Sequence, residues 1–204
     1  SPEAIRIMGD KISSRQAADA AGAPTVPGTM EALTTADEIK SIASEFAYPV
    51  AIKAAHGGGG KGLRVVWSEE EVEDALEGAR REANAYFGNA EVYVEKYIET
   101  PRHVEAQIIL DGHGNALFLG ERDCSVQRRH QKLIEETPTS AMNDDQRPAL
   151  GEAAIAVARA SDYHNAGTAE DRLAPSGDYY FLEMNTRLQV EHTVTEMVTG
   201  IDLV

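Results

Sequence analysis

The chain has little cysteine, little positive charge and no long apolar run. Cys124 is its single cysteine, which excludes an intrachain disulfide framework. No apolar stretch approaches the length that crosses a bilayer, and the opening residues lack the basic and apolar segments of a secretion signal. With 34 acidic against 19 basic side chains, the net charge of −15 disfavours nucleic acid and anionic membranes as partners. These absences predict a cytoplasmic protein that binds neither nucleic acid nor membranes.

The positive charge that is present gathers in one short span of an otherwise acidic chain. Arg122, Arg128, Arg129, His130 and Lys132 all fall within it. A charge run is often only a solvated edge, but this concentration favours a site for a small anionic ligand. The 204 residues, 42% of them hydrophobic, suit a globular protein of one domain or two small ones.

The segment FLEMNTRLQVEHTVT, residues 181–195, is the most informative part of the chain. It places polar groups on every second residue, at Glu183, Asn185, Arg187, Gln189 and Glu191. Alternate residues of an extended segment face the same side, so these five groups would share one space. Such a row is costly to desolvate unless ligands or metals satisfy it, and it therefore predicts a working site.

The pattern of the whole chain predicts an α+β fold. In the first half we expect helices at 10–22, 35–48 and 68–86 and strands at 49–55 and 63–67. Thr35 with Glu38, and Ser68 with Glu71, form capping-box patterns before the second and third of these helices. In the second half we expect an antiparallel meander of strands at 92–98, 103–111, 116–126 and 132–138, a helix at 144–162, and a hairpin of 165–173 and 179–185.

A glycine-rich loop, HGGGGKG, separates the first two strands. Gly57, Gly59 and Gly62 match a dinucleotide-binding pattern, but a strand follows them where that pattern requires a helix. The P-loop pattern also fails, because Ala55 stands in place of its first glycine. A glycine loop between antiparallel strands can still fold over a triphosphate. Lys53, on the strand before it, either meets an anionic partner or extends to the surface.

Two carboxylates on the last hairpin predict a metal site. Glu170 and Glu183 lie at similar distances from its turn, so they can face one another across the strand pair. Mg²⁺ between them would relieve their repulsion, and Asn185 would add a neutral oxygen. Two exposed strand glutamates are the alternative. Arg187 offers a planar fork for a carboxylate or bicarbonate and Glu191 a general base, or the two form a plain salt bridge.

At these residues the sequence resembles the biotin carboxylases, the ATP-grasp part of acetyl-CoA, propionyl-CoA and pyruvate carboxylases. The matching segments are MGDK, AIKAAHGGGGKG, VEKYIETPRHVEAQ, ERDCSVQRRHQKLIEETP, NAGTAE and FLEMNTRLQVEH. The amino-acid sequences of these segments are most similar to those of the α subunits of bacterial acyl-CoA carboxylases. The resemblance implies an ATP-grasp fold, with a leading helix and connection at 1–23, a hinged lid at 24–95 and the first part of the core at 96–204.

The resemblance also implies a reaction and its participants. ATP and bicarbonate would form carboxyphosphate, whose CO₂ is then taken up by biotin, with Mg²⁺ or Mn²⁺ on the nucleotide. The implied partners are a biotin carboxyl carrier domain and a carboxyltransferase subunit, and a homodimer of the full-length parent is left open. The acyl-CoA is chosen by the carboxyltransferase, so this chain does not reveal it.

Residue roles carry over from the family onto matching positions. The phosphate contacts would be Lys11, Lys53, Gly57, Gly58, Gly59, Gly60 and Gly62. Adenine and ribose would be held by Glu95, the backbone through Lys96, Tyr97 and Ile98, and His103, with Gln127 and His130 along the nucleotide. The metal ligands would be Glu170, Glu183 and Asn185. Bicarbonate would be held by Lys132, Arg187, Gln189 and Val190, with Glu191 as its general base and Arg187 also stabilising the biotin enolate.

The chain departs from the family pattern at several points. Asp171-Arg172 stands where the family usually has Phe-Leu, which places charges in a strand expected to be apolar, and Thr193 replaces a proline. Both ends look cut, and the Rossmann-like domain before MGDK and the later core are missing. We therefore expect a fragment with weak or no turnover. A nucleotide-binding module without turnover, and a ligase of the carbamoyl-phosphate synthetase type, are the alternatives.

Overall fold

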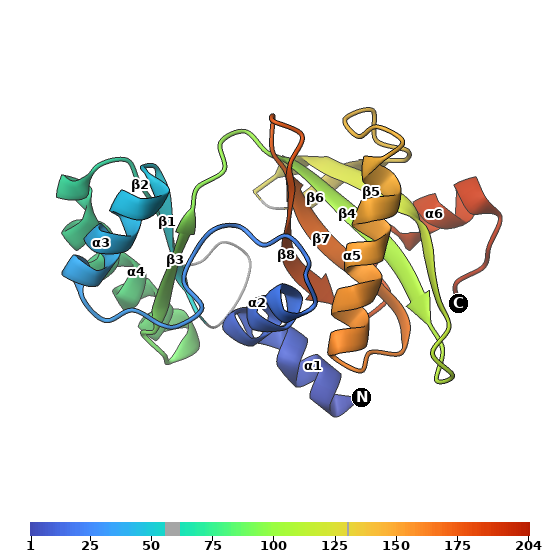
Figure 1. The fold of residues 1–204 in the computed structure, drawn as a ribbon, viewed down its shortest axis with the longest axis horizontal. Helices are drawn as coiled ribbons and strands as arrows, with labels where there is room; N and C mark the ends of the chain where they lie inside the picture. Colours follow the sequence, from blue (N-terminus) through green and yellow to red (C-terminus); the bar gives the residue numbers. More distant parts are fainter. Residues whose placement is uncertain (56–61, 130) are drawn as a thin grey trace. The chain divides into compact units, whose positions relative to one another are not determined.

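The computed structural model describes residues 1–55, 62–129 and 131–204. These residues form two compact units, whose elements Figure 1 labels. The large unit comprises residues 1–9, 13–25 and 99–204, and the small unit comprises residues 10–12 and 26–98. The expected lid at 24–95 and core at 96–204 stay predictions, because compactness does not reveal which segment moves.

The described part of the small unit is a three-stranded antiparallel sheet with helices packed against it. The strand order is β2-β1-β3, with β1 at Val50–Ala54, β2 at Leu63–Val66 and β3 at Val92–Lys96. The helices are α3 (Ala36–Phe46), the single 3-10 turn η1 (Glu69–Glu71) and α4 (Val72–Phe87). Ile39 of α3 and Leu76 of α4 join Val50 and Ile52 of the central strand in one apolar core.

The two predicted capping boxes have different outcomes. Thr35 caps α3, and Glu38 returns its side chain to the backbone of Thr35, so this box is confirmed. The prediction for Ser68 and Glu71 is wrong. Ser68 precedes the 3-10 turn without a side-chain cap, and the Glu71 carboxylate instead accepts a hydrogen bond from the Trp67 amide at 2.8 Å. The 3-10 turn moves Glu71 out of the position that a capping box needs.

The described part of the large unit is built on a five-stranded antiparallel sheet of order β6-β5-β4-β7-β8. Its strands are β4 (Arg102–Leu110), β5 (Ala116–Arg128), β6 (Gln131–Glu136), β7 (Asn165–Leu173) and β8 (Tyr179–Asn185). Its helices are α1 (Pro2–Gly9), α5 (Gln146–Ala160), α6 (His192–Thr199) and most of α2 (Lys11–Ala20). The predicted α+β class is confirmed, and β4, β5 and β6 form the predicted antiparallel meander. The prediction is wrong for its first strand, at 92–98, because β3 pairs with β1 in the sheet of the small unit.

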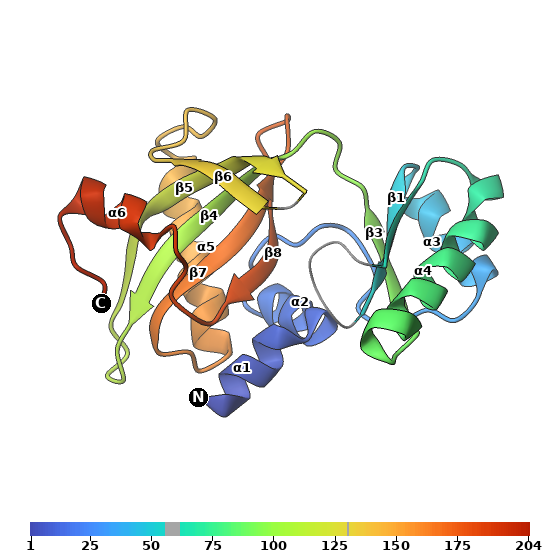
Figure 2. The same cartoon turned by 180° about the vertical axis from the view of Figure 1, so that it is seen from behind.

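The large sheet has one apolar and one polar face. On β4, Val104, Ala106 and Ile108 enter the apolar core, which they share with Leu150 of α5 and Met8 of α1. The residues that alternate with them are polar and turn to the other face. Figure 1 shows α5 across one face, and the reverse view in Figure 2 shows α6 on the opposite one. Among the described residues, no helix is both long and apolar enough to span a bilayer.

Asp171 breaks the alternation of the apolar face. It pairs with Val104 of β4 and Phe181 of β8, both of which belong to the apolar core. Only 3% of Asp171 is exposed, and no hydrogen bond or ion pair reaches its carboxylate from any described residue. Burial raises the pKa of Asp171 to about 7, and the nearby charge of Glu170 adds to this, while His103 opposes it. The predicted intrusion of charge into this strand is confirmed.

We predict that Asp171→Leu stabilises the protein, and more so at higher pH. Because the pKa of Asp171 is raised in the folded state, its ionisation lowers the free energy of unfolding. This loss is absent below the unfolded-state pKa, grows as the pH rises, and is complete above pH 7. The two pKa values correspond to about 4 kcal/mol of unfolding free energy at pH 8 and about 2 kcal/mol at pH 5. Urea unfolding of both proteins at the two pH values measures this difference.

Asp19→Leu, at an exposed position of α2, is the matched control. It should change the unfolding free energy by less than about 0.5 kcal/mol, because surface substitutions away from packed or paired groups have small effects. A gain for Asp171→Leu that is equal at pH 5 and pH 8 would contradict the buried carboxylate as its source.

Candidate functional site

A network of charged side chains lies on the polar face of the large sheet, with Lys132 of β6 at its centre. The Lys132 ammonium Nζ lies 2.5 Å from a carboxylate oxygen of Glu105, 3.0 Å from one of Glu170 and 2.8 Å from one of Glu191. These three carboxylates come from β4, from β7 and from the segment just before α6. A single ammonium group therefore connects three separate elements. The Lys132 side chain is 17% exposed.

Arg122 of β5 forms the second cationic centre and is completely buried. Its Nε donates to Glu105 at 2.6 Å, and its Nη1 donates to Gln107 and to Thr195 of α6, each at 2.8 Å. Its Nη2 donates to the side-chain oxygen of Gln189 at 3.4 Å. The guanidinium thereby connects β4 and β5 with the first turn of α6 and with the loop between β8 and α6.

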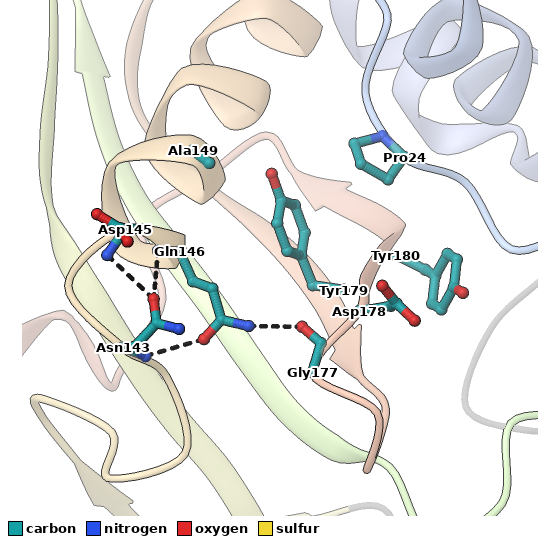
Figure 3. Close-up of a pocket in the computed structure, with 9 residues that line it drawn as sticks. All are labelled: Pro24, Asn143, Asp145, Gln146, Ala149, Gly177, Asp178, Tyr179 and Tyr180. Atoms are coloured by element: carbon teal, nitrogen blue, oxygen red, sulfur yellow. Dashed lines mark hydrogen bonds between the residues drawn. The ribbon is translucent and has the colours of Figure 1, made fainter.

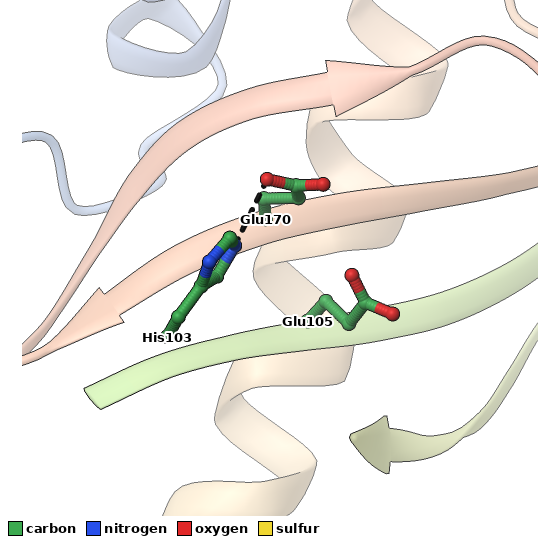
Figure 4. A group of neighbouring side chains, drawn as sticks. All are labelled: His103, Glu105 and Glu170. Atoms are coloured by element: carbon green, nitrogen blue, oxygen red, sulfur yellow. Dashed lines mark hydrogen bonds and ion pairs between the residues drawn. The ribbon is translucent and has the colours of Figure 1, made fainter. Parts of the chain in front are cut away.

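Glu170 of β7 is the most heavily bonded carboxylate of the network. Its Oε1 accepts from Asn185 at 2.8 Å and Gln189 at 3.1 Å, and its Oε2 lies 2.9 Å from Nε2 of His103. Gln127 contacts the other ring nitrogen of that histidine at 2.7 Å. Figure 4 shows His103 and Glu105 projecting from β4 and Glu170 from β7, with α5 behind the sheet.

The ionisation of the network follows from these contacts. Burial alone would raise the pKa of Glu170, but hydrogen bonds and charge from His103 and Lys132 outweigh it and hold that pKa at about 2. Burial opposes the charge of Lys132 as well, yet the carboxylates of Glu105 and Glu170 raise its pKa above the usual range. Burial would raise the pKa of Glu191, but the hydrogen bond and charge of Lys132, a backbone hydrogen bond and the charge of Arg122 together outweigh it and lower that pKa. Glu170, Lys132 and Glu191 are therefore charged at neutral pH.

The predicted pairing of the two hairpin carboxylates is confirmed. Glu170 and Glu183 lie directly opposite one another in the β7–β8 register, and directly opposed residues of antiparallel strands share a face. Glu183 is half-buried, and no described residue donates a hydrogen bond or a positive charge to it. Asn185 donates through its Nδ2 to Glu170, which leaves its amide oxygen for another partner. Two carboxylates and an amide oxygen fit the oxygen ligands that Mg²⁺ prefers.

The row of alternating polar residues extends only as far as Asn185. β8 ends there, and residues 186–191 form bends and turns, so the alternation argument for Arg187, Gln189 and Glu191 is wrong. A turn nevertheless brings Gln189 and Glu191 back to the network. Arg187 is exposed and, among the described residues, donates only to the neighbouring carbonyl of Leu188 at 3.3 Å. Val190 is 86% exposed. The structure does not bring these last two into the network.

The predicted nucleotide contacts of the small unit lie on its sheet, just after β3 and at the start of α2. Lys53 on β1 does not extend to the surface: it is buried and forms an ion pair with Glu95 of β3, itself a predicted contact. Lys96 donates to the backbone carbonyls of Ala47 and Tyr48. Further predicted contacts are Lys11, which begins α2, Ile98, which is half-buried, and Tyr97, whose ring meets Trp67 edge-on with centroids 6.1 Å apart.

Gly62 is the one predicted loop glycine within the described residues, and its position requires glycine. Its φ is +71°, and a Cβ there would lie 2.8 Å from the Cβ of Ala54. Gly57, Gly58, Gly59, Gly60 and His130 lie outside the described residues.

Four residues of the network were not predicted as site residues. They are Glu105, Gln107, Arg122 and Thr195. Arg122 was predicted only as part of a basic span that favours an anionic ligand, with a solvated edge as the alternative. The signal for Glu105 was present, since His103, Glu105 and Gln107 alternate along β4 in the way that the last hairpin does. Thr195 lies on a helix, and only the tertiary fold brings it to Arg122.

A separate pocket of about 410 Å³ lies in the large unit and contains none of the predicted site residues. Figure 3 shows it between the start of α5 and the β7–β8 turn. Gln146 spans its edge by donating to the carbonyl of Gly177 at 2.6 Å, and Tyr179 forms part of its wall. The charged network described above does not reach it.

We predict that Arg122→Met lowers the free energy of unfolding by about 3 kcal/mol, because it leaves the buried carboxylate of Glu105 short of its main partner. Arg128→Met, which removes an exposed arginine of the same strand, should cost less than about 0.5 kcal/mol. Adding Glu105→Gln to Arg122→Met should cost less than the sum of the two single changes. Chemical denaturation measures all four variants. Equal losses for Arg122→Met and Arg128→Met would refute the role of the buried pair.

Comparison with known proteins finds relatives of high sequence identity. A curated biotin carboxylase of Nostoc sp. is 54% identical over 99% of this chain and 45% of its own length. The propionyl-CoA carboxylase alpha chain of Ruegeria pomeroyi is 48% identical over 98% of this chain and 30% of its own length. The chain thus spans less than half the length of these curated relatives.

Solved structures show the same fold. The biotin carboxylase of Campylobacter jejuni, in a β-γ-ATP complex, superposes with a TM-score of 0.94 at 51% identity, over 100% of this chain and 46% of that one. The biotin carboxylase domain of the Hydrogenobacter thermophilus 2-oxoglutarate carboxylase, with MgADP and bicarbonate, reaches 0.91 at 47% identity, over 98% and 44%. Residues 10–204 match the family model described as carbamoyl-phosphate synthase L chain, ATP binding domain. The chain therefore belongs to this ATP-grasp family, and its resemblance to the biotin carboxylases is confirmed.

Proposed function

We propose that this chain supplies the ATP- and bicarbonate-binding part of a biotin carboxylase, which carboxylates biotin on a carrier protein through carboxyphosphate. The observation that carries the proposal is the charged network on one face of the large sheet, where Lys132 joins Glu170 and Glu191 beside the opposed carboxylate of Glu183. Its chemistry matches a site that binds an anion and a divalent cation side by side. The nucleotide, magnesium and bicarbonate in the two solved relatives support this assignment.

Glu170, Glu183 and Asn185 would hold Mg²⁺ or Mn²⁺ on this proposal. When bound, the metal ion would neutralise charge on the triphosphate and orient it. The surrounding charges fit that role. Around the proposed site, Glu105, Glu170, Glu183 and Glu191 outnumber Lys132 and Arg122, so the network carries excess negative charge that attracts a cation.

Lys132 and Glu191 would act on bicarbonate. The ammonium of Lys132 attracts the anion, and the Glu191 carboxylate is the base that takes its proton. In the structure Lys132 pairs with Glu191 and lowers its pKa, which weakens it as a base. Bicarbonate that drew the ammonium toward itself would release Glu191 and raise that pKa. Gln189 donates beside them, and we assign Arg187 and Val190 to the same anion, with Arg187 also at the biotin enolate.

The remaining predicted residues would hold ATP. His103 and Gln127 form a hydrogen-bonded chain that ends on Glu170, which places them beside the proposed metal. The phosphate contacts on this proposal are Lys11, Lys53 and the loop from Gly57 to Gly62. The base and ribose contacts are Glu95, Lys96, Tyr97, Ile98 and His103, and Gln127 and His130 lie along the nucleotide. Residues 24–95 would be the lid that closes over the nucleotide and keeps water from carboxyphosphate.

The partners would be a biotin carboxyl carrier domain and a carboxyltransferase subunit, with biotin as the carried substrate, in the cytoplasm. The acyl-CoA carboxylase alpha chains among the relatives support this context. A second candidate is a nucleotide-binding module without turnover, because the chain covers less than half of each relative. Bicarbonate-dependent release of ADP that biotin stimulates would support the carboxylase. Binding of MgATP without that release would support the module.

We predict that Glu183→Gln weakens the binding of MgATP at least tenfold and leaves the binding of metal-free ATP unchanged. Glu183 has no partner among the described residues, so this change should disturb the proposed metal site without disturbing the fold. Calorimetry of both variants with and without Mg²⁺ measures the effect. Glu152→Gln, at an exposed position of α5, is the control. An equal loss with and without magnesium would argue against Glu183 as a metal ligand.

A further inference from the structure

Arg172 lies on the polar face of the large sheet, at one end of the charged network. On β7 it follows Glu170 by two residues and therefore shares its face. In the register it lies directly opposite His103 of β4 and Tyr180 of β8. A strand rises about 3.3 Å per residue, so Arg172 begins roughly 6.6 Å from Glu170 along β7. Along β7, Arg172 and Thr168 lie on opposite sides of Glu170, and Thr168 is the residue that pairs with Asn185. Arg172 therefore lies on the side of Glu170 that is away from Asn185.

The guanidinium of Arg172 has no partner within residues 1–55, 62–129 and 131–204. The side chain is half-buried, yet no hydrogen bond, ion pair or ring contact involves it. Asp171 cannot neutralise it, because adjacent residues of a strand point to opposite faces and Asp171 enters the apolar core. Glu170, the nearest carboxylate along the strand, is already bonded by four other side chains. A half-buried arginine without a partner among the described residues is available for contact with a ligand.

We propose that Arg172 contacts the nucleoside end of the bound nucleotide, with its guanidinium plane stacked on the base. This inference rests on the proposed function, in which the phosphates lie at Glu170 and Glu183 and the ribose at His103. Arg172 lies beside His103, the proposed ribose contact, and on the far side of Glu170 from Asn185, so it is nearer to the nucleoside end than to the phosphates on this proposal. A planar guanidinium stacks on aromatic faces, as a compact ammonium cannot. Arg172 thereby replaces the apolar residue that the family usually has at this position.

The test compares Arg172→Leu and Arg172→Lys with the unchanged chain, using AMP, ADP and ATP without metal in competition with a fluorescent ADP analogue. A stacked base contact predicts that both substitutions weaken all three nucleotides by the same factor, about fivefold. Arg81→Leu, which removes the same charge from an exposed position of α4, should leave the three affinities unchanged. Thermal unfolding of each variant verifies the fold, and Arg172→Gln replaces Arg172→Leu if the latter does not fold.

Two results would overturn the inference. Unchanged affinities in the Arg172 variants would show that the side chain makes no contact with the nucleotide. A loss that grows from AMP to ATP would show that Arg172 acts through its charge on the phosphates and not on the base. Failure of the proposed function is a different result, because the unchanged chain would then bind none of the three nucleotides.

Discussion

The buried ion pair between Arg122 and Glu105 is the interaction on which the polar face of the large unit depends. Both side chains are fully buried, and a charge in that position is tolerated only when a partner is held in good geometry. Glu105 shares its second oxygen with Lys132, so the pair extends to the cation that binds Glu170 and Glu191. The remaining donors of Arg122 reach Gln189 and Thr195. One guanidinium thus fixes the loop and the helix that complete the site.

This arrangement explains how a sheet can carry a dense charged site on one face and a stable apolar core on the other. β4 alternates between Val104, Ala106 and Ile108 on the core side and polar groups on the site side. The charges on the site side neutralise one another in part, and the remaining excess of carboxylates favours a cation. Asp171 is the exception, because it places on the core side a carboxylate that no described residue pairs with. Asp171 therefore lowers the free energy of unfolding. Its neighbour Arg172 adds a positive charge on the site side of the sheet.

Much of the fold follows from the sequence because local rules decide it. Alternation predicted the strands of the meander, and the position of the hairpin turn predicted that Glu170 faces Glu183. The capping box at Thr35 was also local enough to predict. The sequence rules fail where the local backbone departs from the regular strand or helix that they assume. A 3-10 turn displaces Glu71 from its cap, and the strand ends at Asn185, so Gln189 and Glu191 reach the site through a turn that the alternation could not foresee. The contact between Thr195 and Arg122 joins residues 73 positions apart and depends on the whole fold.

The central claim is that the carboxylates of the last hairpin and the ammonium of Lys132 converge on a metal-bound nucleotide. The most direct measurement is the anomalous scattering of Mn²⁺ in crystals of this chain grown with Mn²⁺ and a non-hydrolysable ATP analogue. The account predicts a manganese peak at about 2.2 Å from oxygens of Glu170, Glu183 or Asn185 and of the nucleotide phosphates. A nucleotide whose phosphates and manganese lie elsewhere on the chain would contradict it.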